Sequence, residues 1–530
     1  MPDQIGLLMP LPSSSGERPS GKAEPAKPGP MAFSLEEATI AGLQEMMETG
    51  RMTSEKLVSL YLERIEEIDR RGPGLNSIIE VNPDALAIAR DLDRERKEKG
   101  PRGPLHGVPI VIKDNIDTAD KMETTAGSLA LLGSKPVRDA YVVDRLRAAG
   151  AVILAKTNLS EWANFRSTRS SSGWSARGGL TRNPYALDRS ASGSSSGSAV
   201  AVSASLAAVA VGTETDGSIT SPAAVCGLVG IKPTVGLVSR DGIVPIAASQ
   251  DTAGPMARTV ADAAALLSVL AGTDARDAAT RDARGQPDYT RFLTRDGLRG
   301  ARIGVARGYV SSHDGVQAVF DEAIARMKSQ GAEIVDPVTL PERTAYVDAE
   351  FEVLLHEFKA GLASYLAEFA ASAPIRNVAD LIAFNERERA REMPHFGQEL
   401  LVMAEARGGL DSPAYREAAA KAWRATREEG IDKALAEHKL DALVAPTGGP
   451  AWLIDLVNGD SHSEGFTSPA AVAGYPHVTV PMGHVAGLPV GLSFVACAWS
   501  EPTLLRLAYA FEQATQHRRA PGFARTVLIA

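Results

Sequence analysis

Serine-rich segments and a lysine at the end of an apolar run supply the side chains best suited to catalysis. Residues 190–198 read SASGSSSGS, and Ser218 follows Gly217 in the segment GTETDGSI. A serine hydroxyl attacks an acyl carbon once a base removes its proton. Lys113 directly follows the apolar residues 108–112, where burial would keep its amine neutral and therefore basic. These residue types indicate acyl transfer by a serine that a lysine activates.

Other residues leave alternatives open at this point. Lys156 and Lys232 also follow apolar segments, so residue type alone allows either of them to be the base. Residues 193–197 match the pattern G-x-S-x-G of the hydrolase nucleophile elbow, which would make Ser195 the nucleophile. That motif requires a strand directly before it. The segment from Asn183 onwards contains Pro and many Ser, and it indicates no strand.

The apolar run at residues 199–211, AVAVSASLAAVAV, follows the Ser/Gly segment without a break. Ala and Ser dominate the run, so we expect a buried helix, and a flexible linker would not lead directly into a core element. The run is shorter than the roughly 20 residues that cross a bilayer. Residues 1–32 contain no convincing signal peptide. We therefore expect a cytoplasmic protein without membrane contact, and export stays open as an alternative.

Composition argues against several kinds of partner and cofactor. The 530 residues include 56 Lys and Arg and 65 Asp and Glu, for a formal net charge of −9. The sequence contains no stripe of basic residues that could bind nucleic acid. Two cysteines, Cys226 and Cys497, are too few for a disulfide framework or a cysteine-rich zinc site. Cys226 lies in sequence typical of core packing. The nine histidines include no His-Glu-x-x-His motif. We expect neither a metal nor another cofactor.

Apolar patterns place the candidate residues in an α/β fold. Short runs typical of strands alternate with helical patterns, which predicts a sheet covered by helices on both faces. The runs are residues 108–112, 151–154, 303–305, 442–445, 478–480 and 490–495. Residues 341–440 are charge-rich and mostly helical in pattern, which predicts an insertion or a lid over the sheet.

The N-terminal residues predict where the folded part begins. Residues 1–32 are rich in Ser, Pro, Gly and Lys, which is typical of a disordered tail. Ser34 and Glu37 have the spacing of a capping box, which predicts a first helix from Ser34 to Gly50. A second helix is expected after Thr53. Residues 33–530 are expected to form a single domain.

Residues 212–219 and the segments PAA and CGLVGIKPT that follow resemble the signature of an amidase family with a Ser–cis-Ser–Lys triad. The resemblance implies the family's large, mixed and twisted β-sheet. Matched residue by residue, Lys113 is the family's lysine, Ser194 is the serine with the cis peptide bond, and Ser218 is the nucleophile, 24 residues after Ser194. The family's oxyanion hole falls on the backbone N–H groups of Thr215, Asp216, Gly217 and Ser218. We expect Gly193, which has no side chain, to permit the unusual backbone conformation at the cis peptide bond. We expect Ser195 to support the site through hydrogen bonds.

The resemblance covers nearly the whole chain from residue 34 and is greatest to bacterial peptide amidases. The further matching segments are residues 156–164, 173–179, 249–258, 380–385, 473–476 and 499–502. Many family members have Gly-Gly before the nucleophile, whereas this chain has Asp216-Gly217. Asp216 could face the pocket and repel a carboxylate, or it could be a turn residue whose carboxylate binds backbone N–H groups.

The resemblance implies metal-free hydrolysis of a carboxamide through an acyl-enzyme, with Ser194 relaying the proton from Ser218 to Lys113. We expect the enzyme to release ammonia from C-terminal peptide amides. Alternatives within the family are cleavage of aryl acylamides, carbamates or other small amides, and the glutamine-hydrolysing component of an amidotransferase. A non-catalytic binding module would have no use for a buried lysine beside two serines. The expected partner is a small or short-peptide amide, bound by a monomer or homodimer.

Overall fold

The computed structural model describes residues 34–463 and 465–527, so the tail predicted at residues 1–32 lies outside the described residues. Within these ranges, eleven strands build one large sheet and two short strands pair separately. The strands are β1 (Ile78–Val81), β2 (Pro109–Lys113), β3 (Val152–Thr157), β4 (Trp174–Ser175), β5 (Gly179–Leu180), β6 (Val209–Glu214), β7 (Val229–Lys232), β8 (Thr252–Ala257), β9 (Arg302–Val305), β10 (Glu333–Val335), β11 (Ala442–Pro446), β12 (His477–Val485) and β13 (Leu488–Val495).

The helices precede, separate and follow these strands. The helices as far as β10 are α1 (Ile40–Glu48), α2 (Ser54–Arg64), α3 (Ala85–Lys99), α4 (Tyr141–Ala148), α5 (Ser196–Ser203), α6 (Thr220–Val225), α7 (Val260–Leu270) and α8 (Asp314–Ser329). The later helices are α9 (Val347–Glu368), α10 (Val378–Arg387), α11 (Arg389–Glu392), α12 (Glu399–Glu405), α13 (Pro413–Trp423), α14 (Asp432–His438), α15 (Ser468–Ala473) and α16 (Glu501–Thr515). Two short helical segments matter for the site, η3 (Glu161–Asn164) and η7 (Arg343–Ala345).

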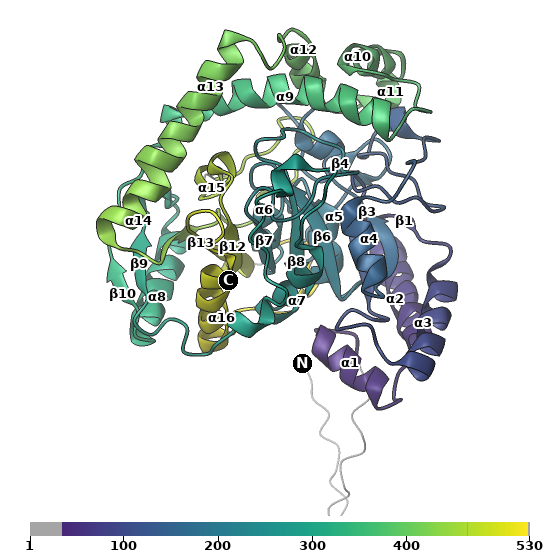
Figure 1. Ribbon diagram of the computed structural model, residues 1–530, viewed down its shortest axis with the longest axis horizontal. Helices are drawn as coiled ribbons and strands as arrows, with labels where there is room; N and C mark the ends of the chain where they lie inside the picture. Colours follow the sequence, from purple (N-terminus) through teal and green to yellow (C-terminus); the bar gives the residue numbers. More distant parts are fainter. Residues whose placement is uncertain (1–33, 464, 528–530) are drawn as a thin grey trace, which may run out of the picture. The chain divides into compact units, whose positions relative to one another are not determined.

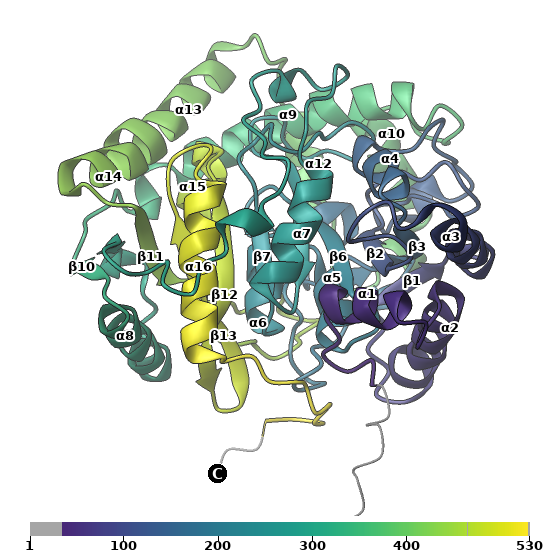
Figure 2. The same ribbon diagram turned by 60° about the horizontal axis from the view of Figure 1, so that its bottom comes forward.

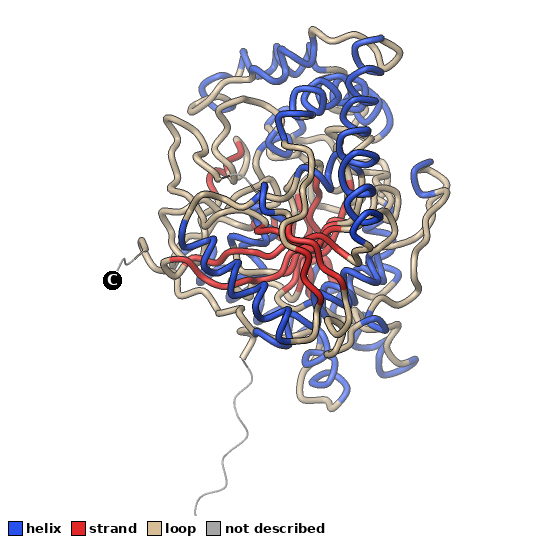
Figure 3. Tube along the Cα trace, turned by 90° about the vertical axis from the view of Figure 1, so that its left-hand side faces the viewer, coloured by secondary structure: helices blue, strands red, loops and turns tan. Residues whose placement is uncertain are grey.

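The large sheet is mixed, and its centre is built for burial. The strand order is β1-β3-β2-β6-β8-β7-β12-β13-β11-β9-β10. Strand β2 runs parallel to β3 and β6, while β6 runs antiparallel to β8. Every side chain of β2 and of β6 is buried, as expected for strands with helices on both faces. Figure 3 shows the sheet edge-on, with helices on either side of the twisted strands.

Helices cover the sheet in the arrangement that the sequence predicts. Helix α7 contacts β8, and α16 contacts β12 and β13; both lie in front of the strands in Figure 2. Helix α5 contacts β2 and β6, and α6 contacts β7 and β12. The predicted α/β class is therefore confirmed. The six predicted strand runs each overlap an observed strand, namely β2, β3, β9, β11, β12 and β13, and the first two runs begin one residue before theirs.

A cap of helices, formed by residues 341–440, crosses one end of the sheet (Figure 1). Every regular element from Arg343 to His438 is helical, from η7 to α14. We call the described residues outside the cap the sheet domain. The long helix α9 buries Leu355, Phe358 and Leu362 in a cluster that includes Trp162 and Phe165 of the sheet domain. Apolar burial therefore joins the cap to the segment around η3.

The apolar run at residues 199–211 is not one helix, so that prediction is wrong. Helix α5 ends at Ser203, and β6 begins at Val209. Ser205 has a positive φ of 55°, which breaks the helical path. The β-branched Val209 and Val211 then pair with Ile110 and Ile112 of β2. Composition alone cannot locate such a boundary, because both elements are buried on all sides.

The first helix also begins later than predicted. Helix α1 begins at Ile40, and Thr39 is its N-cap, with Oγ1 accepting a hydrogen bond from Gly42 N at 3.1 Å. Glu37 has a φ of 57°, and its carboxylate pairs with Arg518 at 2.7 Å. The predicted capping box is therefore wrong, because Glu37 makes a distant ion pair instead. The second helix, α2, does begin after Thr53 as predicted. None of the described helices is long and apolar enough to span a membrane.

Candidate active site

Lys113 lies at the C-terminal end of β2, an interior strand of the sheet between β3 and β6. The parallel register pairs Ile112 with Val211 of β6, so Lys113 comes beside the end of β6. Its Nζ lies 2.7 Å from Ser194 Oγ, 2.9 Å from Thr213 Oγ1 and 3.2 Å from the Thr213 carbonyl oxygen. The whole side chain is buried. The strand pairing therefore directs the amine onto one serine and one threonine.

The amine of Lys113 is poised to take up a proton. Burial lowers the pKa of Lys113 to about 7, because the charged form loses its hydration. The negative charges of Asp251 and Glu214 act in the opposite direction. At neutral pH a substantial fraction of Lys113 is consequently neutral, and its lone pair can accept a proton from the Ser194 hydroxyl 2.7 Å away.

Ser194 lies between the lysine and the start of α5. The Gly193–Ser194 peptide bond is cis, the bond type that the resemblance implies for this serine. The Ser194 carbonyl oxygen accepts a hydrogen bond from Ser160 N at 3.1 Å. A Cβ at Gly193 would overlap the Ser160 hydroxyl, so only glycine fits there. Gly193 thus allows the close approach that holds Ser194 against Lys113.

Ser218 lies in the turn between β6 and α6. Gly217 has a φ of 77°, a conformation that favours glycine. The carboxylate of Glu214 accepts hydrogen bonds from Ile219 N at 2.8 Å and Thr220 N at 2.9 Å, which fixes the start of α6. The Ser218 carbonyl oxygen accepts a hydrogen bond from Ser195 N at 3.1 Å. The Ser218 hydroxyl bonds to no other described residue, so it is available to a substrate.

The four residues 215–218, which we call the oxyanion loop, carry unused donors. The backbone N–H groups of Thr215, Asp216, Gly217 and Ser218 donate no hydrogen bond to any residue in the described ranges. Unused N–H groups beside a free hydroxyl match the requirement for stabilising a tetrahedral oxyanion. Thr215 Oγ1 donates to Asp251 at 2.5 Å, which anchors one end of the loop.

The alternative nucleophile and bases have structural contacts instead. Ser195 Oγ is fully buried and bonds to the Thr213 carbonyl oxygen at 3.0 Å and Thr213 N at 3.2 Å. Lys156 Nζ bonds to the Ile116 carbonyl oxygen at 2.7 Å and Thr124 Oγ1 at 2.8 Å. Lys232 Nζ bonds to the Pro233 carbonyl oxygen at 3.1 Å. None of these contacts joins the three residues to Ser194 or Ser218. Ser195 therefore supports β6, Lys156 holds the segment that follows β2, and Lys232 binds the carbonyl of the next residue.

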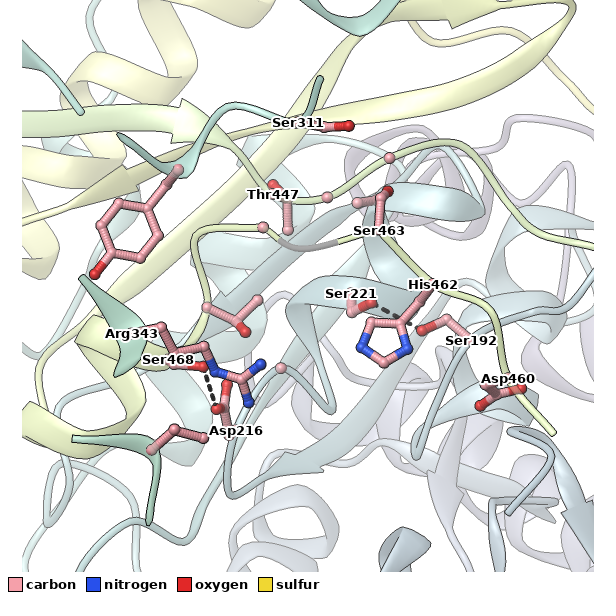
Figure 4. A pocket seen from close by; sticks show the side chains of 18 of the residues that line it. Ser192, Asp216, Ser221, Ser311, Arg343, Thr447, Asp460, His462, Ser463 and Ser468 are labelled. Atoms are coloured by element: carbon pink, nitrogen blue, oxygen red, sulfur yellow. Dashed lines mark hydrogen bonds between the residues drawn. The ribbon is translucent and has the colours of Figure 1, made fainter. Parts of the chain in front are cut away.

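Asp216 faces the cavity, as one of its two alternatives requires, and the alternative of a carboxylate bound to backbone N–H groups is wrong. Its carboxylate lines the cavity described below, but Oδ2 accepts a hydrogen bond from the side chain of Ser468, at 2.6 Å, rather than from backbone N–H groups. Its other oxygen, Oδ1, is buried and has no donor among the described residues. Asp216 therefore anchors the oxyanion loop to α15 (Figure 4).

A cavity of about 880 Å³ opens beside Gly193 and Gly217. Its wall includes sheet-domain residues and cap residues, among them Arg343, Phe351 and Leu354. This volume is in the range that holds a drug-sized ligand or a short peptide. Figure 4 shows Asp216 and Arg343 on one side of the cavity and His462 and Asp460 on the other.

Sequence comparison agrees with this geometry. A model of the amidase family matches residues 56–505. The chain belongs to the amidase family. A probable amidase of Arabidopsis thaliana is 44% identical over 93% of this chain and 92% of its own length. A putative amidase of Schizosaccharomyces pombe is 38% identical over 93% of this chain and 87% of its own length.

Solved structures give the same assignment. The peptide amidase of Stenotrophomonas maltophilia is 56% identical, with a TM-score of 0.88, and the match covers 92% of this amidase and 99% of that chain. An amidase-family protein of Bacillus anthracis is 37% identical, with a TM-score of 0.84 over 92% of this chain and 93% of its own. The amidase fold and amide-hydrolysing class of this chain follow from these similarities.

Several cavity residues of this amidase carry no signal in the sequence. Asp460 accepts hydrogen bonds from Ser172 N at 3.1 Å and Trp452 Nε1 at 3.0 Å, so its carboxylate organises the far end of the cavity. Arg343 reaches the cavity from η7. These residues come from separate segments, and no spacing rule connects them. Trp162 is buried in the cluster below the cap.

Proposed function

We propose that this amidase hydrolyses the C-terminal carboxamide of peptides to a carboxylate and ammonia, through Ser218, Ser194 and Lys113. The observation that carries the proposal is the 2.7 Å contact between the buried Lys113 amine and Ser194, whose neighbour Ser195 donates its N–H to the Ser218 carbonyl oxygen at 3.1 Å. Cavity size and similarity to a peptide amidase support the substrate class.

Acylation begins with proton transfer along the triad. Ser218 Oγ attacks the carboxamide carbon and gives its proton to Ser194, while the Ser194 proton passes to neutral Lys113. The developing oxyanion accepts hydrogen bonds from N–H groups of the oxyanion loop. The tetrahedral intermediate then breaks its C–N bond, and the proton returns from Lys113 through Ser194 to the nitrogen. Ammonia leaves, and Ser218 holds the acyl group as an ester.

Deacylation repeats the sequence with water. Water attacks the ester carbon and gives a proton to Ser194, which again passes its own to Lys113. The intermediate breaks its bond to Ser218 Oγ, and the returning proton restores the serine hydroxyl. The products are the peptide acid and the free enzyme.

Incubation of a short amidated peptide with the enzyme tests the substrate class. We expect mass spectrometry to detect a single replacement of NH2 by OH at the C-terminus, with release of ammonia and without cleavage of internal peptide bonds. Ser218→Ala serves as the inactive control. Loss of a whole residue would contradict the proposal. Rapid cleavage of anilides or carbamates without action on any peptide amide would assign the alternative specificity, and ammonia release from glutamine would favour the amidotransferase-type activity.

Chelation tests the proposed chemistry without metal. No group of three or more His, Cys, Asp or Glu side chains is placed to hold a metal ion in the described ranges. Because the proposal gives the base to Lys113 and the oxyanion stabilisation to backbone N–H groups, we expect activity to survive exhaustive dialysis against EDTA. Loss of activity that zinc or manganese restores would overturn this part of the proposal.

A further inference from the structure

A buried carboxylate of the oxyanion loop lacks a hydrogen-bond donor. Asp216 Oδ2 is satisfied by Ser468 Oγ at 2.6 Å, but Oδ1 is buried without a donor in the described part of the chain. An unpaired buried carboxylate oxygen is costly, so its surroundings are expected to supply a proton.

Glu350 of the cap helix α9 lines the same cavity as Asp216. Its side chain is only 3% exposed, and Gln250 Nε2 donates to its Oε1 at 3.1 Å. Burial and the negative charge of Asp216 raise the pKa of Glu350 well above its usual range. Gln250 Nε2 also donates to the Thr215 carbonyl oxygen at 3.3 Å, so the same amide contacts the oxyanion loop.

We propose that Glu350 carries a proton at neutral pH and donates a hydrogen bond to Oδ1 of Asp216, and that this bond positions the oxyanion loop. Glu350 is then a positioning residue, because it acts on the reaction through Asp216. The inference deepens the proposed function and depends on it for the role of the loop. The protonation of Glu350 itself is independent of the substrate.

The position of Asp216 explains why this bond matters. Asp216 belongs to the oxyanion loop, so its own backbone N–H is one of the four unused donors, and it directly precedes Gly217 and Ser218. Ser468 holds one oxygen of its carboxylate from α15, and the proposed bond from Glu350 holds the other from the cap. A displacement of about 1 Å in a catalytic group can cost about 100-fold in rate. The cap therefore contributes to catalysis through a buried hydrogen bond, in addition to forming the cavity wall.

Charged groups around Glu350 and Asp216 determine how the proposed hydrogen bond between them responds to pH. The positive charge of Arg343 acts to lower the pKa of Glu350, against the effects of burial and Asp216. The Tyr346 phenol lies near both carboxyls, and Lys232 and Glu214 interact with Asp216 from the sheet side. When Glu350 ionises at alkaline pH, two negative charges face each other and the bond is lost. We therefore expect kcat to fall on the alkaline side.

A second carboxyl pair between cap and sheet domain provides a matched control. Arg166 donates to Glu161 at 2.8 Å, and Glu392 of α11 lies 3.8 Å from the same guanidinium. Glu392 Oε2 is buried without a donor among the described residues, and burial raises the pKa of Glu161 well above its usual range. This pair also joins the cap to the sheet domain, but neither member belongs to the oxyanion loop.

The test compares Glu350→Gln, Glu350→Ala and the control Glu392→Gln. Glutamine can donate its amide N–H to Asp216 and accept from Gln250, as protonated Glu350 does. We expect Glu350→Ala to lower kcat on a peptide amide by about 10- to 100-fold with little change in KM. Glu350→Gln should retain at least about ten times the kcat of the alanine variant and lose the alkaline fall. Glu392→Gln should keep both kcat and the alkaline fall.

Infrared difference spectra give a readout that does not depend on activity. At neutral pH, wild type minus Glu350→Gln should contain the C=O stretching band of a protonated carboxyl. Absence of that band, or equal losses of kcat in the glutamine and alanine variants, would overturn the inference. If the band is present at neutral pH but the wild type acts on no peptide amide, the protonation of Glu350 is supported and the proposed function is rejected.

Discussion

Ser218→Ala is expected to lower turnover of an amide by at least about 10⁴-fold, because no other hydroxyl can form the acyl-enzyme. Ser195 is buried and bonded to Thr213, and Ser194 is bonded to Lys113. Neither can replace Ser218 at the end of the oxyanion loop. Direct measurement of ammonia release, at substrate concentrations well above KM, gives the loss in kcat.

The same variant should remain folded. The Ser218 hydroxyl makes no hydrogen bond to the residues that the structure describes, so its removal leaves no buried partner unsatisfied. We expect the free energy of unfolding to change by less than about 1 kcal/mol. A folded Ser218→Ala enzyme that still turns over amides would contradict the assignment of the nucleophile.

Lys113→Ala is expected to lower turnover by about 10³-fold or more, because both serines then lack a proton acceptor. In the wild type, kcat/KM should rise with pH as Lys113 loses its proton, with an apparent pKa of about 7 on the acid side. The sign follows from the mechanism: protonated Lys113 cannot accept a proton from Ser194. The variant should lose this acid limb together with its activity.

Lys156→Ala and Lys232→Ala are the controls for the lysine. Both lysines are fully buried, but their hydrogen bonds go to loop and strand-end groups rather than to Ser194. Their loss is expected to lower thermal stability while keeping the acid limb near pH 7. Near-normal turnover in Lys113→Ala, or a shift of the limb in Lys232→Ala alone, would show that the base is wrongly assigned.

The sequence predicts most of the proposed catalytic centre because each proposed member lies in a short, self-contained pattern. Lys113 ends an apolar strand, and Ser194 and Ser218 follow glycines within two short motifs. The structure brings all three to the ends of β2, α5 and β6. Strand β2 ends at Lys113, and β6 begins at Val209, 96 residues later. Their parallel pairing brings the C-terminal ends of the two strands side by side.

The remaining parts depend on tertiary contacts that no local pattern encodes. The split between α5 and β6 arises at Ser205 inside a uniformly apolar run. The N-cap of α1 is Thr39 because Glu37 pairs with Arg518 at the other end of the chain. Glu350 lines the same cavity as Asp216 from a helix more than 100 residues later in the chain. Its role follows only from burial and from the missing donor at Oδ1.

Covalent labelling tests the central claim, that Ser218 is the nucleophile, most directly. A serine-directed fluorophosphonate should attach once per chain, and peptide mapping by mass spectrometry should locate the adduct on Ser218. Ser218→Ala should then remain unlabelled, and Lys113→Ala should label much more slowly. An adduct on Ser195 would contradict the triad and support the nucleophile elbow at residues 193–197 instead.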